Sequence, residues 1–364
     1  MPGTARRVFI SDCEGPLSLN DNAFEAAQAF IPRGDCLFTL LSRYDDVLAD
    51  LAKRPGYRAG TTLTLITPFL KAYGVTNAQL VAHAAETLAV LPGVEEMVRH
   101  LATRFPVFIV STSYEHYLTA LCARLEVPRA NVYCTPLDLD RYPLPENEAR
   151  RLRALAEEVT SVPMIQVPDH ATSLHDLSDT DRATIAKLDA VFEQTMPRMT
   201  CGRLLKEVVP MGGEGKATAV RTIVAHTAGD LARALYVGDS ITDVQALQLV
   251  AAGGGLAIAF NGNRYAVANA EIAVLSDTAL VTALLVDVFA QRGKQAVLDL
   301  AGHWSRRAVE AASAPSALVT ALLDPSSTRF PAVYVVDEAN VETVTEESRR
   351  VRQRVRGDAI GRLG

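Results

Sequence analysis

The chain has 364 residues, of which 49% are hydrophobic and 21% are charged, and this composition is typical of a globular protein with one large or two medium domains. Its formal net charge of −6 argues against a nucleic-acid-binding surface or an anionic-membrane surface, although a local basic pocket for one phosphate remains compatible with that total. Small molecules or other proteins are the expected partners, and homo-oligomer formation is left open.

Cysteine use and the N-terminal residues predict the compartment. Five cysteines are scattered along the chain without a C-x-x-C pair, which indicates a reduced, cytoplasmic protein. The first predicted strand begins within the first ten residues and leaves no room for a signal peptide. The apolar stretch 247–260 is short and interrupted by glycines, so we expect no membrane span.

The N-terminal part predicts one buried strand followed by a helical insertion. Residues 7–11 are β-branched and aromatic and stop at a turn that contains Gly15. The spacing of apolar residues then becomes helical, with Asn22 as the expected N-cap and Glu25 completing a capping box. We interpret residues 21–91 as a helical insertion.

Strands and helices alternate in the rest of the chain, with one interruption. Alternation of this kind predicts an α/β fold with a doubly wound parallel sheet. Residues 136–210 break the rhythm with prolines and two helical stretches, which predicts a second insertion. The expected strands are 107–110, 131–134, 234–237, 256–260 and 272–275, and the expected helices are 93–103, 115–125, 146–159, 179–195, 215–226, 243–250 and 278–289.

The C-terminal segment, 293–364, carries helical patterns around one strand-like run, 332–336. Its end, 346–362, is rich in arginine and is interpreted as a solvated helix or a frayed tail. The predicted organisation is therefore a core of residues 1–20 and 92–292 that contains the insertion 136–210, a helical cap of residues 21–91, and a C-terminal extension.

The first candidate site residues follow the first strand. Asp12 sits where a side chain leaves a parallel sheet and faces the crevice above it, and its carboxylate could attack phosphorus and bind a hard cation. Glu14 points to the same side in an extended chain and could move a proton to or from a leaving oxygen. If the Asp-x-Glu motif stood alone, two acidic residues in an ordinary turn at a strand end would be a better interpretation than a catalytic pair.

Ser111 follows the second apolar run directly, and a hydroxyl there, with the free amides of the next turn, can hold a phosphoryl oxygen. Thr112 is a near-equivalent candidate. Alone, this signal is weak because serine commonly ends strands and caps helices.

Lys216 lies among glycines at the start of a predicted helix, where unpaired amides and the helix dipole favour a phosphate. A Walker A loop does not fit, because Pro210 replaces its first glycine and Ala217 replaces the hydroxyl residue that would hold magnesium. By itself, a lysine in this place is more often a surface residue.

Asp239 and Asp243 follow a predicted strand and a glycine turn. Asp239 would reach a metal ion directly, and Asp243 would either complete the metal shell or orient Lys216. The alternative makes Asp239 a turn residue and Asp243 an acid at a helix N-terminus, which for Asp243 alone is about equally favoured.

These four segments, in this order and at these strand ends, resemble the motifs of the haloacid dehalogenase superfamily and most closely its phosphoserine phosphatase branch. The resemblance covers residues 7–15 and 92–290. It implies a Rossmann-like core with a helical cap, and a Mg²⁺-dependent phosphatase that acts through an aspartyl-phosphate. Glu14 departs from the pattern, since most family phosphatases have Asp there; glutamate resembles a minority variant that includes an enzyme that also transfers the phosphoryl group.

The resemblance also implies the roles of the residues. Asp12 would be the nucleophile and Glu14 the acid and base, while Ser111, Thr112 and Lys216 would bind the phosphoryl group. Mg²⁺ would be held by Asp12, Glu14 through its carbonyl, and Asp239. The expected substrate is a small phosphorylated metabolite, and Arg43 and Asn261 are candidates for binding or positioning it, although Arg43 fits a surface cluster equally well. Two alternatives stay open, namely a phosphotransferase with the same intermediate and a non-catalytic protein that binds a phosphorylated ligand or serves in assembly.

Overall fold

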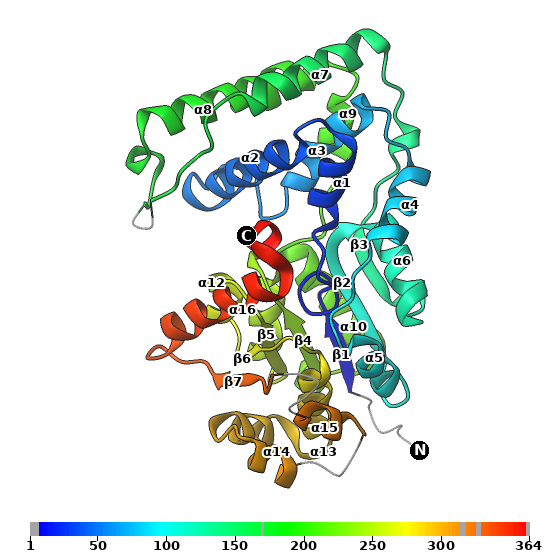
Figure 1. Ribbon diagram of the computed structural model, residues 1–364, viewed down its shortest axis with the longest axis vertical. Helices are drawn as coiled ribbons and strands as arrows, with labels where there is room; N and C mark the ends of the chain where they lie inside the picture. The colour runs from blue at the N-terminus through cyan, green and yellow to red at the C-terminus, as the bar shows by residue number, and fades with distance from the viewer. Residues whose placement is uncertain (1–6, 169–170, 313–316, 325–328, 362–364) are drawn as a thin grey trace.

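Seven strands form a single sheet in the order β3-β2-β1-β4-β5-β6-β7, and the computed structural model describes residues 7–168, 171–312, 317–324 and 329–361 (Figure 1). All neighbouring strands are parallel except β7, which is antiparallel to β6. The α/β class and the mostly parallel sheet predicted from the sequence are confirmed. The strands are β1 (Val8–Ser11), β2 (Val107–Tyr114), β3 (Val132–Thr135), β4 (Ala234–Gly238), β5 (Leu256–Phe260), β6 (Ile272–Leu275) and β7 (Ala332–Val335).

Both faces of the sheet are buried, which explains why the central strands are apolar at every position. Phe9 faces one hydrophobic core and its neighbours Val8 and Ile10 face another. The first core is closed by α5 (Val94–Ala102), α6 (Glu115–Leu125) and α13 (Leu280–Gly302), and the second by α10 (Glu214–Thr227), α11 (Val244–Ala252) and α12 (Arg264–Ala268).

The strand order reverses between β1 and β4, which are neighbours in the middle of the sheet. Their register pairs Ser11 with Val237, and the backbone N–H of Asp12 donates to the carbonyl oxygen of Val237 at 2.8 Å. In open α/β sheets, ligands bind beyond the carboxyl ends of the strands at such a reversal. The loops that carry Asp12 and Asp239 start at this place.

The two insertions form one helical cap rather than two separate additions. The first contributes α1 (Asn22–Phe30), α2 (Gly34–Asp46) and α3 (Thr62–Ala72), and the second contributes α7 (Glu146–Thr160), α8 (Asp179–Asp189) and α9 (Gly202–Glu207). They share a hydrophobic core in which Phe192 of the second insertion stacks on Tyr44 of the first, with ring centroids 5.9 Å apart. Figure 1 shows these helices together above the sheet, with α7 and α8 farthest from it. The remaining helix of the first insertion, α4 (Asn77–Thr87), packs on α6 of the core.

The N-cap residue of α1 lies one position before the predicted one. The N-cap of α1 is Asp21, whose side chain accepts the backbone N–H of Phe24, and Glu25 accepts hydrogen bonds from the side chain of Asn20 instead of closing a capping box on Asn22. Asn22 is already the first helical residue, and its backbone N–H, which has no partner within the helix, donates to the carboxylate of Glu14.

The C-terminal segment packs against the core. Within α13 two helical stretches meet at Gly293, whose φ of +81° is not helical, so the predicted boundary near residue 292 coincides with this break. The helices α14 (Arg306–Ala312) and α15 (Ala317–Leu323) pack beside α13. Strand β7 then extends the sheet.

The final helix, α16 (Val341–Gly361), corrects the expectation of a solvated helix or frayed tail. Val344 is buried in the core beside the sheet, and Ser348 is buried with its hydroxyl donating to the carbonyl oxygen of Gly262 at 2.7 Å. Arg362 lies outside the described residues. Among the helices of the described residues, none has the length and apolarity to cross a membrane.

Candidate functional site

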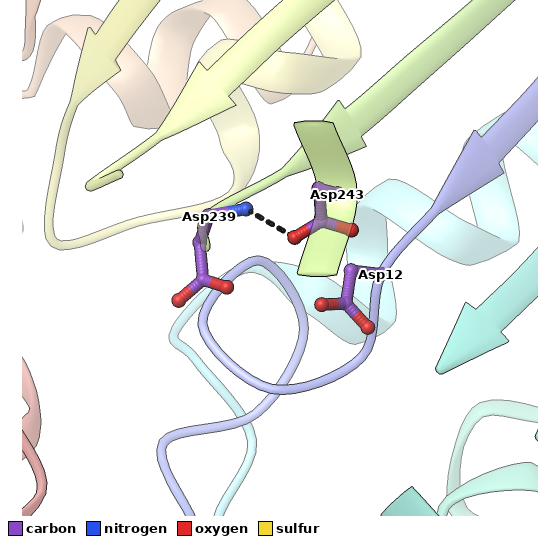
Figure 2. A group of neighbouring side chains, drawn as sticks. All are labelled: Asp12, Asp239 and Asp243. Atoms are coloured by element: carbon purple, nitrogen blue, oxygen red, sulfur yellow. Dashed lines mark hydrogen bonds between the residues drawn. The ribbon is translucent and has the colours of Figure 1, made fainter. Parts of the chain in front are cut away.

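Three buried aspartates meet beyond the carboxyl ends of β1 and β4. Asp12, Asp239 and Asp243 each offer one carboxylate oxygen, and these oxygens lie within 4.8 Å of one another (Figure 2). The exposed fractions are 4%, 3% and 0%, respectively. Carboxylates gathered in this way are stable only with cations or protons between them.

Gly15 allows the two acidic loops to approach. Its φ of +101° belongs to the region that favours glycine, and a Cβ there would lie 2.4 Å from Oδ2 of Asp239. No side chain other than hydrogen fits between the loop after β1 and the carboxylate after β4. The glycine that the sequence places in a turn is therefore also part of the contact between the two acidic loops.

Lys216 supplies one of the balancing charges. It lies in the first turn of α10, is fully buried, and its Nζ is 2.8 Å from Oδ2 of Asp12 and 2.7 Å from Oδ1 of Asp243. Burial alone would lower the pKa of Lys216, but the charges of Asp12 and Asp243 raise it above its ordinary value, so the ammonium stays charged.

Asp243 has little capacity left for a metal ion. Its Oδ1 accepts from Lys216 and from the hydroxyl of Tyr236 at 2.6 Å, and its Oδ2 accepts the backbone N–H groups of Asp239 at 3.0 Å and Ser240 at 3.1 Å. Although burial opposes its charge, Lys216 and these hydrogen bonds hold the pKa of Asp243 below its usual range. Of the two roles open for Asp243, the geometry favours orienting Lys216.

Asp12 and Glu14 hold protons far more strongly than ordinary carboxyl groups. Burial and the neighbouring charge of Asp243 raise the pKa of Asp12 to about 8, despite its contact with Lys216. Burial and the charge of Asp21 raise the pKa of Glu14 to about 8. One Glu14 oxygen accepts the backbone N–H of Asn22 at 2.8 Å. A carboxyl group that titrates near neutral pH suits the transfer of protons.

Ser111 and Thr112 line the same small pocket, about 130 Å³ in volume, as Asp12, Glu14 and Asp239. We call it the catalytic pocket, after the role proposed for it below. Ser111 is buried and its Oγ accepts the N–H of Ser113 at 3.2 Å. The hydroxyl oxygen of Thr112 is buried and finds no hydrogen-bond partner within the described residues. An unpartnered buried hydroxyl at this position could donate to an anion.

Two arginines of α16 also reach the catalytic pocket, and the sequence analysis missed them. Nη1 of Arg352 contacts Oδ2 of Asp239 and lies 3.3 Å from its carbonyl oxygen, while Nη1 of Arg356 lies 3.4 Å from the same carboxylate oxygen. Arg356 also donates from Nε to the carbonyl oxygen of Leu19 at 3.1 Å. The only available sequence signal was their spacing of four residues, which places them on one helix face.

The two predicted substrate residues lie in different surroundings. Arg43 is exposed and lines a larger cavity beside the catalytic pocket. Asn261 is buried, and its side chain is occupied by the backbone N–H of Ser276 at 2.9 Å and the carbonyl oxygen of Ser276 at 2.7 Å. Asn261 therefore does not bind Lys216, and it is not among the described residues that line either cavity. Its side chain instead connects the loop after β5 to the loop after β6.

Comparison with known proteins finds similarity to solved structures. No family model and no curated protein matches the chain. The chain is similar to gene product AF1437 from Archaeoglobus fulgidus. The two share 29% sequence identity with a TM-score of 0.79 over 99% of each chain, so the insertions and the C-terminal segment are aligned together with the core. The name of that structure states no activity.

Proposed function

We propose that this protein is a Mg²⁺-dependent phosphatase of the haloacid dehalogenase type that hydrolyses a small phosphomonoester metabolite. One observation carries the proposal: the carboxylate that follows β1 lies within 2.8 Å of a buried lysine and within 4.8 Å of the carboxylates that follow β4. Three of the four sequence segments that resemble the superfamily motifs line a pocket large enough for a phosphoryl group, and the fourth reaches it through the contact of Lys216 with Asp12.

The donor set fits a hard divalent cation. The available atoms are carboxylate oxygens of Asp12 and Asp239, with the backbone carbonyl of Glu14 as the third ligand that the resemblance implies, and oxygen ligands are those that Mg²⁺ prefers. When bound, Mg²⁺ would offset negative charge on the phosphoryl oxygens and on the carboxylates. A bound cation would lower the raised pKa of Asp12 and favour its ionised form.

The chain's own groups account for the proton and phosphoryl transfers. Ionised Asp12 attacks phosphorus as the bond to the leaving oxygen breaks, and protonated Glu14 gives its proton to that oxygen. Glu14, now ionised, takes a proton from water as the water oxygen attacks the aspartyl-phosphate, which releases inorganic phosphate and restores Asp12. Lys216 and the hydroxyls of Ser111 and Thr112 stabilise the phosphoryl oxygens.

A test of this proposal measures phosphate release from p-nitrophenyl phosphate and from a panel of phosphometabolites. We expect release that depends on Mg²⁺ and falls at least about a thousandfold in Asp12→Asn, because an amide cannot act as the nucleophile. Asp179→Asn, in a residue exposed on α8, serves as the matched control and should retain full activity. Undiminished hydrolysis by Asp12→Asn would remove the proposed nucleophile.

A further inference from the structure

A second, much larger cavity adjoins the catalytic pocket. It has a volume of about 1000 Å³ and lies between the cap, α12 and α16. Asp46, Ile241 and Arg352 line both spaces, so the two lie side by side. The catalytic pocket, at about 130 Å³, accommodates little more than a phosphoryl group, whereas the larger cavity has the size of a site for a small organic molecule. We call it the cap–α16 cavity.

The charge of the cap–α16 cavity is predominantly positive. Its charged lining residues include two acids, Asp46 and Asp50, and five cationic side chains: Arg43, Lys53, Arg264, Arg349 and Arg352. One of the acids, Asp50, already accepts a hydrogen bond from the hydroxyl of Tyr265. Arg349 is paired with Glu346 and Arg352 with Asp239, and the charge of Arg43 favours the ionised form of Asp46. Within the described residues, neither Arg43 nor Lys53 forms an ion pair at hydrogen-bonding distance. This excess in a protein of net charge −6 favours an anionic ligand.

Helix α16 contributes to both spaces from one face. Thr345, Arg349, Arg352 and Gln353 line the cavity, and their spacing of four, seven and eight residues from Thr345 is that of a single helix face. Arg356, four residues after Arg352, continues this face into the catalytic pocket. Arg350 points elsewhere, into a separate cavity beside β7. The final helix therefore runs along the whole path from the acidic cluster to the cap.

We propose that α16 is a substrate-binding element, and that the cap–α16 cavity holds the leaving group of a phosphomonoester with a second anionic group, either a phosphate or a carboxylate. The second anion would lie between Arg349 and Arg352 on α16 and Arg43 on the cap, because guanidinium groups pair with both kinds of anion. The inference rests on the proposed phosphatase function. It assigns a role in substrate selection to a segment outside the part of the chain that resembles the superfamily.

The experiment compares wild type with Arg349→Gln and Arg350→Gln. These arginines are matched, since they are adjacent on α16, exposed, and both paired with Glu346, at 2.9 and 3.0 Å. Only Arg349 faces the cap–α16 cavity. The compounds are glucose 1,6-bisphosphate with glucose 6-phosphate, phosphoserine with phosphoethanolamine, and p-nitrophenyl phosphate. The first pair tests a second phosphate and the second pair tests a carboxylate.

We expect wild type to prefer the member with the second anion in at least one pair. Arg349→Gln should raise KM for that member about five- to tenfold with little change in kcat, and leave KM for its partner and for p-nitrophenyl phosphate unchanged. Arg350→Gln should resemble wild type with every compound. Calorimetric binding to the Asp12→Asn protein with Mg²⁺ should show the same loss of affinity when Arg349→Gln is added.

Two results would overturn the inference while leaving the phosphatase proposal intact. One is hydrolysis of p-nitrophenyl phosphate without any preference for a second anion, and the other is an equal effect of Arg349→Gln and Arg350→Gln. Failure of wild type to hydrolyse every compound in the presence of Mg²⁺ would instead overturn the phosphatase proposal and the inference with it.

Discussion

Gly15 determines how closely the two acidic loops approach, because its α-carbon faces the carboxylate of Asp239 without a side chain between them. An alanine at this position has two separate costs. Its backbone would keep a φ of +101°, which is unfavourable for residues with a Cβ, and the Cβ would press against Asp239. The second cost bears on function, since it separates Asp12 from Asp239.

We predict that Gly15→Ala lowers the free energy of unfolding by more than about 1 kcal/mol and weakens Mg²⁺ binding. Thermal unfolding and calorimetric titration with Mg²⁺ measure the two effects. Gly74→Ala is a matched control, because Gly74 also has a positive φ, of +77°, but nothing lies within 4 Å of the position of its Cβ. The control should lose stability and keep Mg²⁺ affinity; if both variants bind Mg²⁺ as wild type does, the loop contact is not needed for the site.

For single residues, the sequence alone was sufficient to predict the positions of side chains that directly follow a strand or begin a helix. Asp12 and Asp239 follow adjacent parallel strands, and Lys216 begins the helix before β4, so their convergence follows from topology. Asn261 could not be assigned in the same way, because a buried amide after β5 can turn toward the site or toward the next loop. In the structure, its hydrogen bonds to the backbone of Ser276 show that it turns toward the next loop.

Helix α16 is the element whose role differs most from the sequence-based prediction. Arg352 is buried and contacts Asp239, so removing its charge would leave a buried carboxylate with less compensation. In the absence of metal, this loss should be large. A divalent cation bound to Asp239 would restore the balance of charge.

We therefore predict that Arg352→Met lowers the free energy of unfolding by about 3 kcal/mol in EDTA and that Mg²⁺ raises its unfolding midpoint more than that of wild type. Arg354→Met is the control, since Arg354 is exposed two residues further along and lies in the cavity beside β7. Equal Mg²⁺-dependent shifts in wild type and Arg352→Met would contradict an electrostatic role of Arg352 at Asp239.

The strands were predictable because buried parallel strands are short apolar runs between turn residues. Strands β5 and β6 begin and end where the sequence predicted. Strand β2 is longer than predicted because it continues past its apolar run through three polar residues, Ser111 to Ser113, to Tyr114. The position of α16 was not predictable, since its arginines give no apolar stripe and their partner, Asp239, lies more than a hundred residues away. The shared core of the two insertions likewise depends on contacts such as Tyr44 with Phe192.

For the whole molecule, the concentration of buried carboxyl groups makes stability depend on pH. The pKa values of Asp12 and Glu14 are raised to about 8 by burial and by neighbouring acids, so the folded protein holds these protons more tightly than the unfolded chain. Their contribution to stability is fully present below the pKa values of the unfolded chain, near 4. It is lost as the pH rises through about 8.

We predict that the unfolding midpoint in EDTA falls between pH 6 and pH 9, and that the fall is smaller with saturating Mg²⁺, because the cation replaces the protons. Calorimetric scans across this range, with and without Mg²⁺, provide the measurement. Proton release on Mg²⁺ binding at pH 7 should accompany the stabilisation. A fall of the same size under both conditions would mean that Mg²⁺ does not bind among these carboxylates.

The contact between Asp239 and α16 also has a consequence for biosynthesis. Asp12 follows the first strand and Arg356 lies in the last described helix, yet both lie in the catalytic pocket. The nascent chain therefore cannot assemble this pocket until α16 has left the ribosome, and a message truncated before α16 would yield protein without Arg349, Arg352 and Arg356.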